Sequence, residues 1–326
     1  MKIKKEYIIL VLIIVGLSVY LSKRSADRTL YELPELSQVN EKELTKLEIT
    51  RDKTVMVLNK KDDKWYIAPA DYPTDANKVE DMLKAIKDLD LTALVSESKA
   101  YNRYELDEEQ KINVKASQGD SLKLDIDVGK TASSFRHTFV RPAGDERVFH
   151  AQGNLKNAFD VTVDTLRDKT VLSLKAADIQ QININKEQLS MMFTRTQVPV
   201  EVKTADAEKE TDTPPAEPKP AWQAADGQPV NESALNQLLN ALANLQCEKF
   251  IDDSKKEDFK SPLFTIELKG GQDYSLSIFA KAGENDPNYP AVSSGSGYPF
   301  ELSTSQVDRI MKEPAAFLQV PETEPK

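Results

Sequence analysis

The feature that most constrains the fold is an internal repeat. Two segments carry apolar residues at the same five positions, with an offset of 156 residues, as from Val79 to Leu235. In both segments the spacing has the period of an amphipathic helix. We therefore predict two equivalent helices, with apolar faces formed by Val79, Met82, Leu83, Ile86 and Leu89 in the first and by Leu235, Leu238, Leu239, Leu242 and Leu245 in the second.

Short segments with alternating apolar and polar residues surround each predicted helix. In each copy two of them precede a lone Trp, Trp65 or Trp222, and others follow the helix as hairpins with turns at Gly119-Asp120 and Gly270-Gly271. Such alternation is typical of antiparallel strands with one wet face, and an amphipathic helix can cover the other face. Each copy therefore has the predicted order β-β-β-α-β-β-β-β-α.

The repeat sets the predicted fold class and domain organisation. We expect an α+β protein, with an N-terminal transmembrane helix followed by two tandem copies of an antiparallel-sheet-plus-helix unit. Residues 201–220 are rich in Pro and Glu and cannot offset their ordering entropy by burial, so we predict a disordered hairpin loop there. The predicted segments are an anchor at 1–24, a stem at 25–40, a first unit at 41–174, a second unit at 175–319 that contains this loop, and a tail at 320–326.

The N-terminus holds the longest apolar run. Residues 7–22 contain no charged residue and lie between basic flanks such as Lys5 and Lys23. No small-residue cleavage pattern follows the run, which favours a retained anchor over a cleaved signal peptide, and the lack of a polar face argues against a buried core helix. We therefore expect residues 7–22 to contact the lipid bilayer in a single pass, with the body outside the cytoplasm.

Composition narrows the function classes. The chain carries a net charge of −10, and because residues 1–24 are basic, the remaining body is more acidic still. An acidic body argues against nucleic acid as a partner, because duplex binding needs a basic face. One Cys cannot form an internal disulfide, and the two His complete no metal-ligand pattern. We therefore expect no catalytic residue, no metal, no cofactor and no enzymatic activity.

Asp125 and Asp127 are the clearest candidates for chemistry. At i and i+2 on a predicted strand they share one face, where two carboxylates could bind a cation or act in hydrolysis. The second copy has Ser275 and Ser277 at the matching places, which favours a solvated strand face instead. The nearby Gly129-Lys-Thr131 contains part of a phosphate-binding loop but lacks its first Gly and its helix, so we interpret it as a turn.

Other reactive or aromatic side chains have simpler interpretations. His137 and His150 fall on neighbouring predicted strands, and without further ligands a structural or surface role is favoured over a metal site. Cys247 ends an apolar helix pattern and is interpreted as buried and inert rather than nucleophilic. Trp65 and Trp222 could be stacking platforms for a sugar or peptide, but their place before each helix favours packing.

The order of these motifs resembles a known bacterial family. A Leu-x-Ile strand, the lone Trp, Tyr104-Glu-Leu-Asp107 and Leu166-Arg-Asp-Lys169 together resemble the DUF4340 family over most of residues 40–320, with Glu105 where the family commonly has Gly. The resemblance implies a membrane-anchored extracytoplasmic protein of unknown biochemical function. It also implies genes often encoded beside ABC-2-type transporters and gliding-motility-type auxiliary subunits. It supplies no catalytic residues.

These expectations combine into one functional hypothesis. We expect a non-enzymatic, membrane-anchored accessory or scaffold protein of an ABC-type transport system, single-pass in the bacterial inner (cytoplasmic) membrane, with a periplasmic body. One alternative is an envelope carbohydrate-binding protein or hydrolase that uses surface carboxylates such as Asp125 and Asp127. Another is a sensing or assembly scaffold in which residues 201–220 bind a partner.

Overall fold

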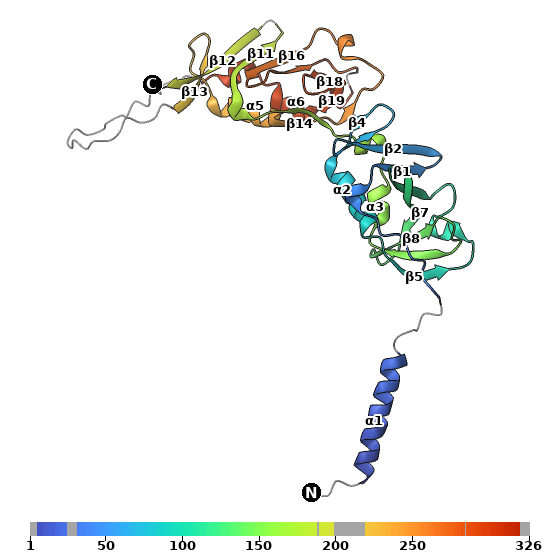
Figure 1. Cartoon of the computed structure of the whole chain (residues 1–326). Coiled ribbons are helices and arrows are strands. Elements are labelled where there is room, and N and C mark those ends of the chain that lie inside the picture. Colours follow the sequence, from blue (N-terminus) through green and yellow to red (C-terminus); the bar gives the residue numbers. More distant parts are fainter. Residues whose placement is uncertain (1–4, 25–30, 188, 199–218, 284, 320–326) are drawn as a thin grey trace, which may run out of the picture. The chain divides into compact units, whose positions relative to one another are not determined.

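The chain consists of two compact units. The computed structural model describes residues 5–24, 31–187, 189–198, 219–283 and 285–319. The units are Met1–Asp168 and Lys169–Lys326 (Figure 1). The division lies before the predicted boundary at 174/175, because β10 (Thr170–Ser173) pairs with β14 (Asn244–Gln246) and therefore belongs to the second unit.

The fold class predicted from the sequence is wrong. Most of the regular backbone lies in antiparallel sheets, and the helices of the two units are short, so the chain is a sheet-rich body. At the N-terminus α1 spans Lys5–Arg24, but among the described residues no helix is both long and apolar enough to cross a membrane. The charge-free run at 7–22 is about 24 Å long as a helix, which is shorter than a hydrocarbon core of ~30 Å.

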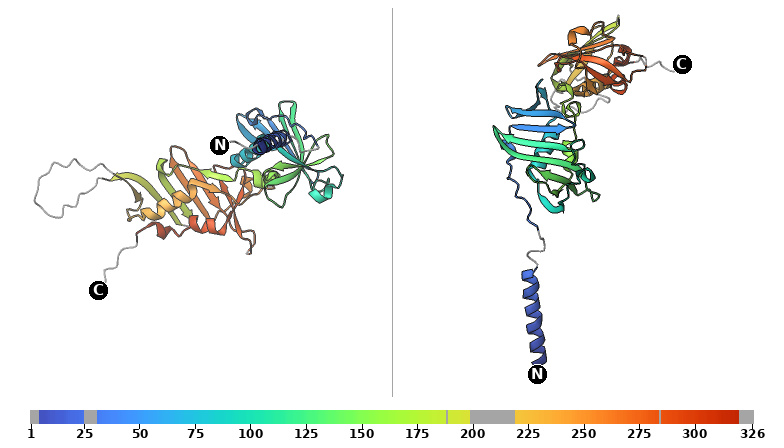
Figure 2. Two further views of the ribbon diagram at one scale, coloured as in Figure 1. Left: turned by 90° about the horizontal axis from the view of Figure 1, so that it is seen from below. Right: turned by 90° about the vertical axis from the view of Figure 1, so that its right-hand side faces the viewer.

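The first unit is built on one sheet. Its nine described strands have the order β4-β3-β2-β1-β6-β7-β8-β9-β5, and Figure 2 shows them side by side. Helices α2 and α3 contact each other, and both contact strands of this sheet. The elements are η1 (Glu41–Glu43), β1 (Lys46–Arg51), β2 (Thr54–Lys61), β3 (Lys64–Ile67), β4 (Tyr72–Pro73), α2 (Ala76–Lys87), β5 (Leu91–Ser96), η2 (Tyr101–Tyr104), β6 (Ile112–Gln118), β7 (Ser121–Thr131), β8 (His137–Pro142), β9 (Val148–Gln152), α3 (Leu155–Phe159) and α4 (Val163–Leu166).

The second unit repeats this sheet order. Its eight described strands run β13-β12-β11-β16-β17-β18-β19-β15, beside the small β10–β14 pair. The helices α5 and α6 contact each other, and α6 also contacts strands of the large sheet. The elements besides β10 and β14 are η3 (Ala176–Asp178), β11 (Ile179–Lys186), β12 (Leu189–Val198), β13 (Lys219–Ala224), α5 (Glu232–Ala243), β15 (Lys249–Phe250), η4 (Lys256–Asp258), β16 (Phe264–Gly270), β17 (Tyr274–Ile278), β18 (Asn288–Ser293), β19 (Phe300–Ser303), α6 (Thr304–Ile310) and η5 (Pro314–Phe317).

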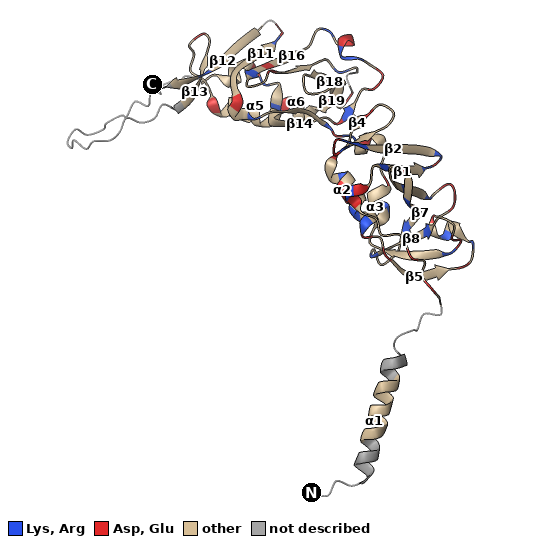
Figure 3. Cartoon of the chain, viewed as in Figure 1, with Lys and Arg blue, Asp and Glu red and all other residues tan. Residues whose placement is uncertain are grey.

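The helices α2 and α5 begin in the same way but differ on their exposed faces. The side chains of Asp75 and Asn231 accept hydrogen bonds from first-turn backbone N–H groups, as N-cap residues do. At equivalent exposed positions α2 carries charges where α5 is neutral, for example Lys84 against Asn240. Figure 3 shows the charged residues along α2.

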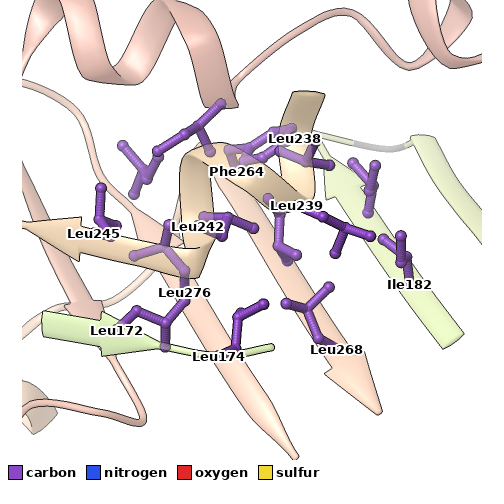
Figure 4. Packing of buried hydrophobic residues seen from close by; sticks show 14 of the residues in the cluster. Leu172, Leu174, Ile182, Leu238, Leu239, Leu242, Leu245, Phe264, Leu268 and Leu276 are labelled. Carbon is purple, nitrogen blue, oxygen red and sulfur yellow. The ribbon is translucent and has the colours of Figure 1, made fainter. Parts of the chain in front are cut away.

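Both sheets bury one face against these helices. In the second unit Leu238, Leu239 and Leu242 of α5 are fully buried over Leu268 and Leu276 (Figure 4). Burying such a side chain contributes about 1.5–3 kcal/mol, so this apolar face holds α5 on its sheet. In the first unit the equivalent core residues are Val79, Met82 and Ile86, packed with Leu47, Ile49, Ile126 and Val128.

Several predicted segments lie outside the described residues. Of the predicted loop at 201–220, only Lys219 and Pro220 are described, and they begin β13. The whole predicted tail at 320–326 lies outside the described residues. Of the predicted stem, residues 31–40 are described. In that part Leu36 and Val39 pack against the core of the first unit, because they are apolar residues within reach of its buried face.

Candidate functional site

A groove of about 830 Å³ lies in the first unit between α2, η1 and the β2–β3 hairpin. Its volume falls within the range of about 300–1,000 Å³ that is usual for ligand sites. Trp65, Val79 and Leu83 form its main apolar wall. We call it the α2 groove, and its charged lining consists of Lys42, Lys60, Lys64, Lys84 and Lys87 together with Glu41, Asp63, Glu80, Asp88 and Asp168.

The β2–β3 hairpin places Lys60 opposite Trp65 in the strand register. The hairpin turns at Asp62 and Asp63, whose φ angles of 48° and 61° match a tight two-residue turn. Trp65 is only 8% exposed, so its ring packs against the core and offers little surface for stacking on a sugar. The Lys60 Nζ donates to the Lys42 carbonyl oxygen at 3.3 Å and pairs with the Asp63 carboxylate at 3.1 Å.

The segment 166–168 closes the sheet edge beside the groove. The backbone N–H of Asp168 donates to the carbonyl oxygen of Pro73 in β4 at 2.8 Å, and the Arg167 guanidinium carbon lies 3.7 Å from the centre of the Tyr72 ring. Asp168 also lines the groove. Two motifs that carry the family resemblance, the lone Trp before α2 and this segment, therefore come together at one place.

Charged side chains of both signs line the α2 groove. Lys87 on α2 pairs with Glu41 on η1, with 3.1 Å between Nζ and Oε1. Glu80 and Lys84 lie exposed on the same helix, one turn apart. Exposed ion pairs of this kind contribute about 0–1 kcal/mol each, so a ligand can exchange them for its own charges at little cost.

The second unit has a cation and a Trp at the same place. Arg195 and Trp222 are directly paired in the β12–β13 register, as Lys60 and Trp65 are in the first unit. The Arg195 guanidinium carbon lies 5.2 Å from the Trp222 ring centre, and its Nη1 donates to the carbonyl oxygen of Ala177 in η3 at 2.9 Å. Trp222 is 6% exposed, so packing explains its place as well.

Asp125 and Asp127 lie on the face of β7 opposite its core residues, and both are held by neighbours. The Asp127 carboxylate accepts hydrogen bonds from Arg141 Nε at 3.1 Å, Arg141 Nη2 at 2.5 Å and Asn113 Nδ2 at 3.0 Å, and Lys111 Nζ lies 3.4 Å away. Asn113 also donates to Asp125 at 2.9 Å. Because Asp127 is only 7% exposed, this arrangement favours a structural role for the pair.

The electrostatics of Arg141 follow from this contact. The pKa of Arg141 is raised. Burial acts to lower it, but the hydrogen bonds to Asp127 and Tyr101, together with the charges of these two groups, outweigh the effect of burial. The guanidinium carbon also lies 4.4 Å from the Tyr101 ring centre, within cation–π range. Arg141 therefore stays charged and ties β7 and β8 to η2.

The predicted turn at Gly129-Lys-Thr131 is instead the end of strand β7. A Cβ atom on Gly129 would collide with the carbonyl oxygen of Tyr104 and the side chain of Leu106, so the Gly permits this segment to pack on the sheet. Glu105, between Tyr104 and Leu106 in the chain, has a left-handed backbone with a φ angle of 56°. Ser261 in the second unit has a similar φ angle of 60°. Gly adopts this conformation without strain, which explains the Gly expected at position 105.

His137 and His150 lie side by side on β8 and β9. Their ring centroids are 5.3 Å apart, and the ring centroids of Phe139 and His150 are 4.8 Å apart. Burial lowers the pKa of His150, and the charge of His137 lowers it further. Within the described part of the chain, no group of three or more His, Cys, Asp or Glu residues could hold a metal ion.

Cys247 follows β14 and is 5% exposed. Its backbone N–H donates to the carbonyl oxygen of Lys169 at 2.9 Å. The sequence predicted this burial from the neighbouring apolar pattern.

The charged residues of the α2 groove were missed by the sequence reasoning. Glu80, Lys84 and Lys87 look like the solvated side of any amphipathic helix. A position-by-position comparison of the two repeated helices could have identified them, because the counterparts of the first two, Asn236 and Asn240, are neutral.

Comparisons with known proteins give one match. Searches of curated proteins and of solved structures found none for this chain. The sequence model of the family described as "Domain of unknown function (DUF4340)" matches residues 65–262, a span that starts at Trp65 and includes Leu166–Lys169. Because this match covers more than half of the 326 residues, the chain belongs to the DUF4340 family.

Proposed function

We propose that this chain is a non-enzymatic accessory or scaffold component of an ABC-type transport system, with its two units on the extracytoplasmic side of the bacterial inner membrane. The observation that carries the proposal is the α2 groove, which offers a partner an apolar wall and charges of both signs. The second unit keeps the corresponding sheet order with a largely neutral helix, as suits a supporting part of a scaffold.

The state of the carboxylates supports binding over hydrolysis. A hydrolytic carboxylate must reach a substrate atom or its attacking water. Asp127 is instead 7% exposed and occupied by Arg141 and Asn113. Trp65 and Trp222 are equally poor platforms for a carbohydrate, because little of either ring is open to solvent.

Crosslinking of the full chain in native membranes tests this function. We expect the captured proteins, identified by mass spectrometry, to include subunits of an ABC-type transporter. A captured set without any transport component would contradict the proposal. Turnover of an envelope polysaccharide that is lost in an Asp125→Asn or Asp127→Asn variant that still folds would favour the hydrolase instead.

The proposed location is tested in the same cells. A membrane-impermeant amine reagent added to spheroplasts should label Lys84, which lies exposed on α2. Labelling of Lys84 only after lysis would place the body on the cytoplasmic side and contradict the location.

A further inference from the structure

We propose that the α2 groove binds an extended segment of a partner polypeptide in which an apolar side chain is flanked by residues of both charge signs. This inference rests on the proposed function, since it names the class of ligand for the same site. Three observations support it: part of Leu83 is exposed, the groove walls carry charges of both signs, and the Trp65 ring is poorly exposed.

Leu83 supplies the apolar contact. It lines the groove and is only half-buried, whereas its counterpart Leu239 in α5 is completely buried. Val79, one helical turn before Leu83, is buried and closes the wall beneath it. A ligand side chain that covers Leu83 removes apolar surface from water, which favours binding in proportion to the area covered.

The charges of the groove walls select the class of ligand. Glu80 and Lys84 project from α2, and Lys42 and Lys64 belong to η1 and β3 on the other side. A nucleic acid or an anionic polysaccharide would place its charges against Glu80 and the other acidic groups, and a polycation would meet the lysines. A polypeptide can present carboxylates and ammonium or guanidinium groups in one segment, so it fits both kinds of wall.

Neutral glycans fit less well. They are held mainly by stacking of sugar rings on exposed aromatic faces, and Trp65 is 8% exposed under its neighbours. Backbone amides and apolar side chains of a peptide need no such platform. The groove volume of about 830 Å³ is large enough for several residues of an extended segment.

Selection of peptides on the full chain tests the inference. A phage-displayed library of random twelve-residue peptides is selected against the full chain, and enriched peptides are synthesised and titrated by fluorescence anisotropy. We expect Glu80→Lys and Leu83→Arg each to weaken binding by about tenfold or more, because each changes a groove wall. Glu80→Lys changes an exposed residue, so it reports on binding even if Leu83→Arg fails to fold.

Two matched controls have the same kind of substitution outside the groove. Asp81→Lys alters the neighbouring exposed residue of α2, which does not line the α2 groove, and Asn236→Lys alters the counterpart of Glu80 in the second unit. We expect both to leave peptide affinity within about twofold, as substitutions outside a contact do. Heparin and poly-lysine serve as polyanion and polycation probes.

Several results would overturn the inference. In the first, the selection yields no peptide that binds more tightly than the unselected library. In the second, Glu80→Lys leaves the affinity of the selected peptides unchanged. In the third, heparin or poly-lysine binds in a way that depends on Glu80. The outcome is separable from the proposed function: groove-binding peptides without transporter subunits among the crosslinked proteins would sustain the inference and remove the transport role.

Discussion

The two units differ where their helices face solvent. Their sheets have corresponding strand orders, and both place a basic residue opposite a Trp in the same hairpin. Yet Glu80 and Lys84 of α2 have the neutral counterparts Asn236 and Asn240 in α5. Packing restrains the buried face of each helix, whereas the exposed face is free to change. A surface that differs on otherwise matching scaffolds is therefore where a separate function is most readily found.

The sheet faces away from the helices show the same contrast. In the first unit Asp127 and Arg141 form an ion pair that is largely shielded from water. In the second unit the counterpart of Asp127 is the neutral Ser277, whose hydroxyl lies 3.3 Å from that of Thr265. We therefore expect loss of the Asp127 charge to destabilise the first unit more than loss of the Ser277 hydroxyl destabilises the second.

The largest expected effect comes from truncating each core separately. Leu238→Ala and Met82→Ala remove fully buried side chains from α5 and α2, which costs about 2–5 kcal/mol each. Each unit holds one of the two Trp residues, so urea titrations of Trp65→Phe and Trp222→Phe backgrounds follow one unit at a time. We expect each truncation to shift only the transition of its own unit. A common shift of both transitions would show that the units unfold together.

Removing the Asp127 charge is the next strongest test. Asp127→Asn leaves Arg141 largely buried beside a neutral amide, which we expect to destabilise the first unit by about 2–3 kcal/mol. The counterpart Ser277→Ala should cost the second unit less than about 1 kcal/mol, because only a hydroxyl contact is lost. Denaturant unfolding measures both, and equal losses would remove the contrast between the two sheet faces.

Acidification should weaken only the first unit. The pKa of His150 is lowered by burial and by His137, so the unfolded chain binds more protons and stability falls as pH drops below about 6.5. Both His residues of the chain lie in the first unit. As the pH is lowered from 7.5 to 5.5, we expect the urea midpoint of the first unit, reported by Trp65, to decrease. The midpoint of the second unit, reported by Trp222, should stay constant.

His150→Gln provides the control for this pH effect. It removes the titrating group, so the midpoint reported by Trp65 should become nearly independent of pH in this window. An unchanged pH dependence in His150→Gln would assign the effect to other groups.

The smallest effect concerns the left-handed residues Glu105 and Ser261. Relief of the left-handed strain of about 1–2 kcal/mol is partly offset by the entropy of Gly, about 0.5–1 kcal/mol. We therefore expect Ser261→Gly to stabilise the second unit by up to about 1 kcal/mol. Glu105→Gly should give less, because the Glu105 carboxylate also pairs with Lys156 Nζ at 2.6 Å. Thermal unfolding that ranks the two variants in the opposite order would contradict this explanation.

Local patterns predicted individual elements well. The apolar spacing predicted α2 and α5. The alternating segments and the Gly119-Asp120 turn lie where β6 and β7 form a hairpin. These features depend on side chains close in the chain, which is why a sequence reveals them.

Features set by distant contacts were not predictable. The unit boundary depends on the pairing of β10 with β14, and the role of Gly129 on the approach of Tyr104. The predicted transmembrane helix was wrong, because no helix in the described part of the chain is both long and apolar enough to cross a membrane. The α2 groove was missed because its walls come from η1, the β2–β3 hairpin and α2, which only the fold brings together.

Photo-crosslinking from equivalent positions tests most directly whether the first unit, rather than the second, contacts the partner. A photoreactive residue is placed at position 84 on α2 or at position 240 on α5, both exposed, in otherwise identical full chains in native membranes. We expect transporter subunits to be captured from position 84 and not from position 240. Equal capture from both positions, or capture from position 240 alone, would contradict a partner site in the α2 groove.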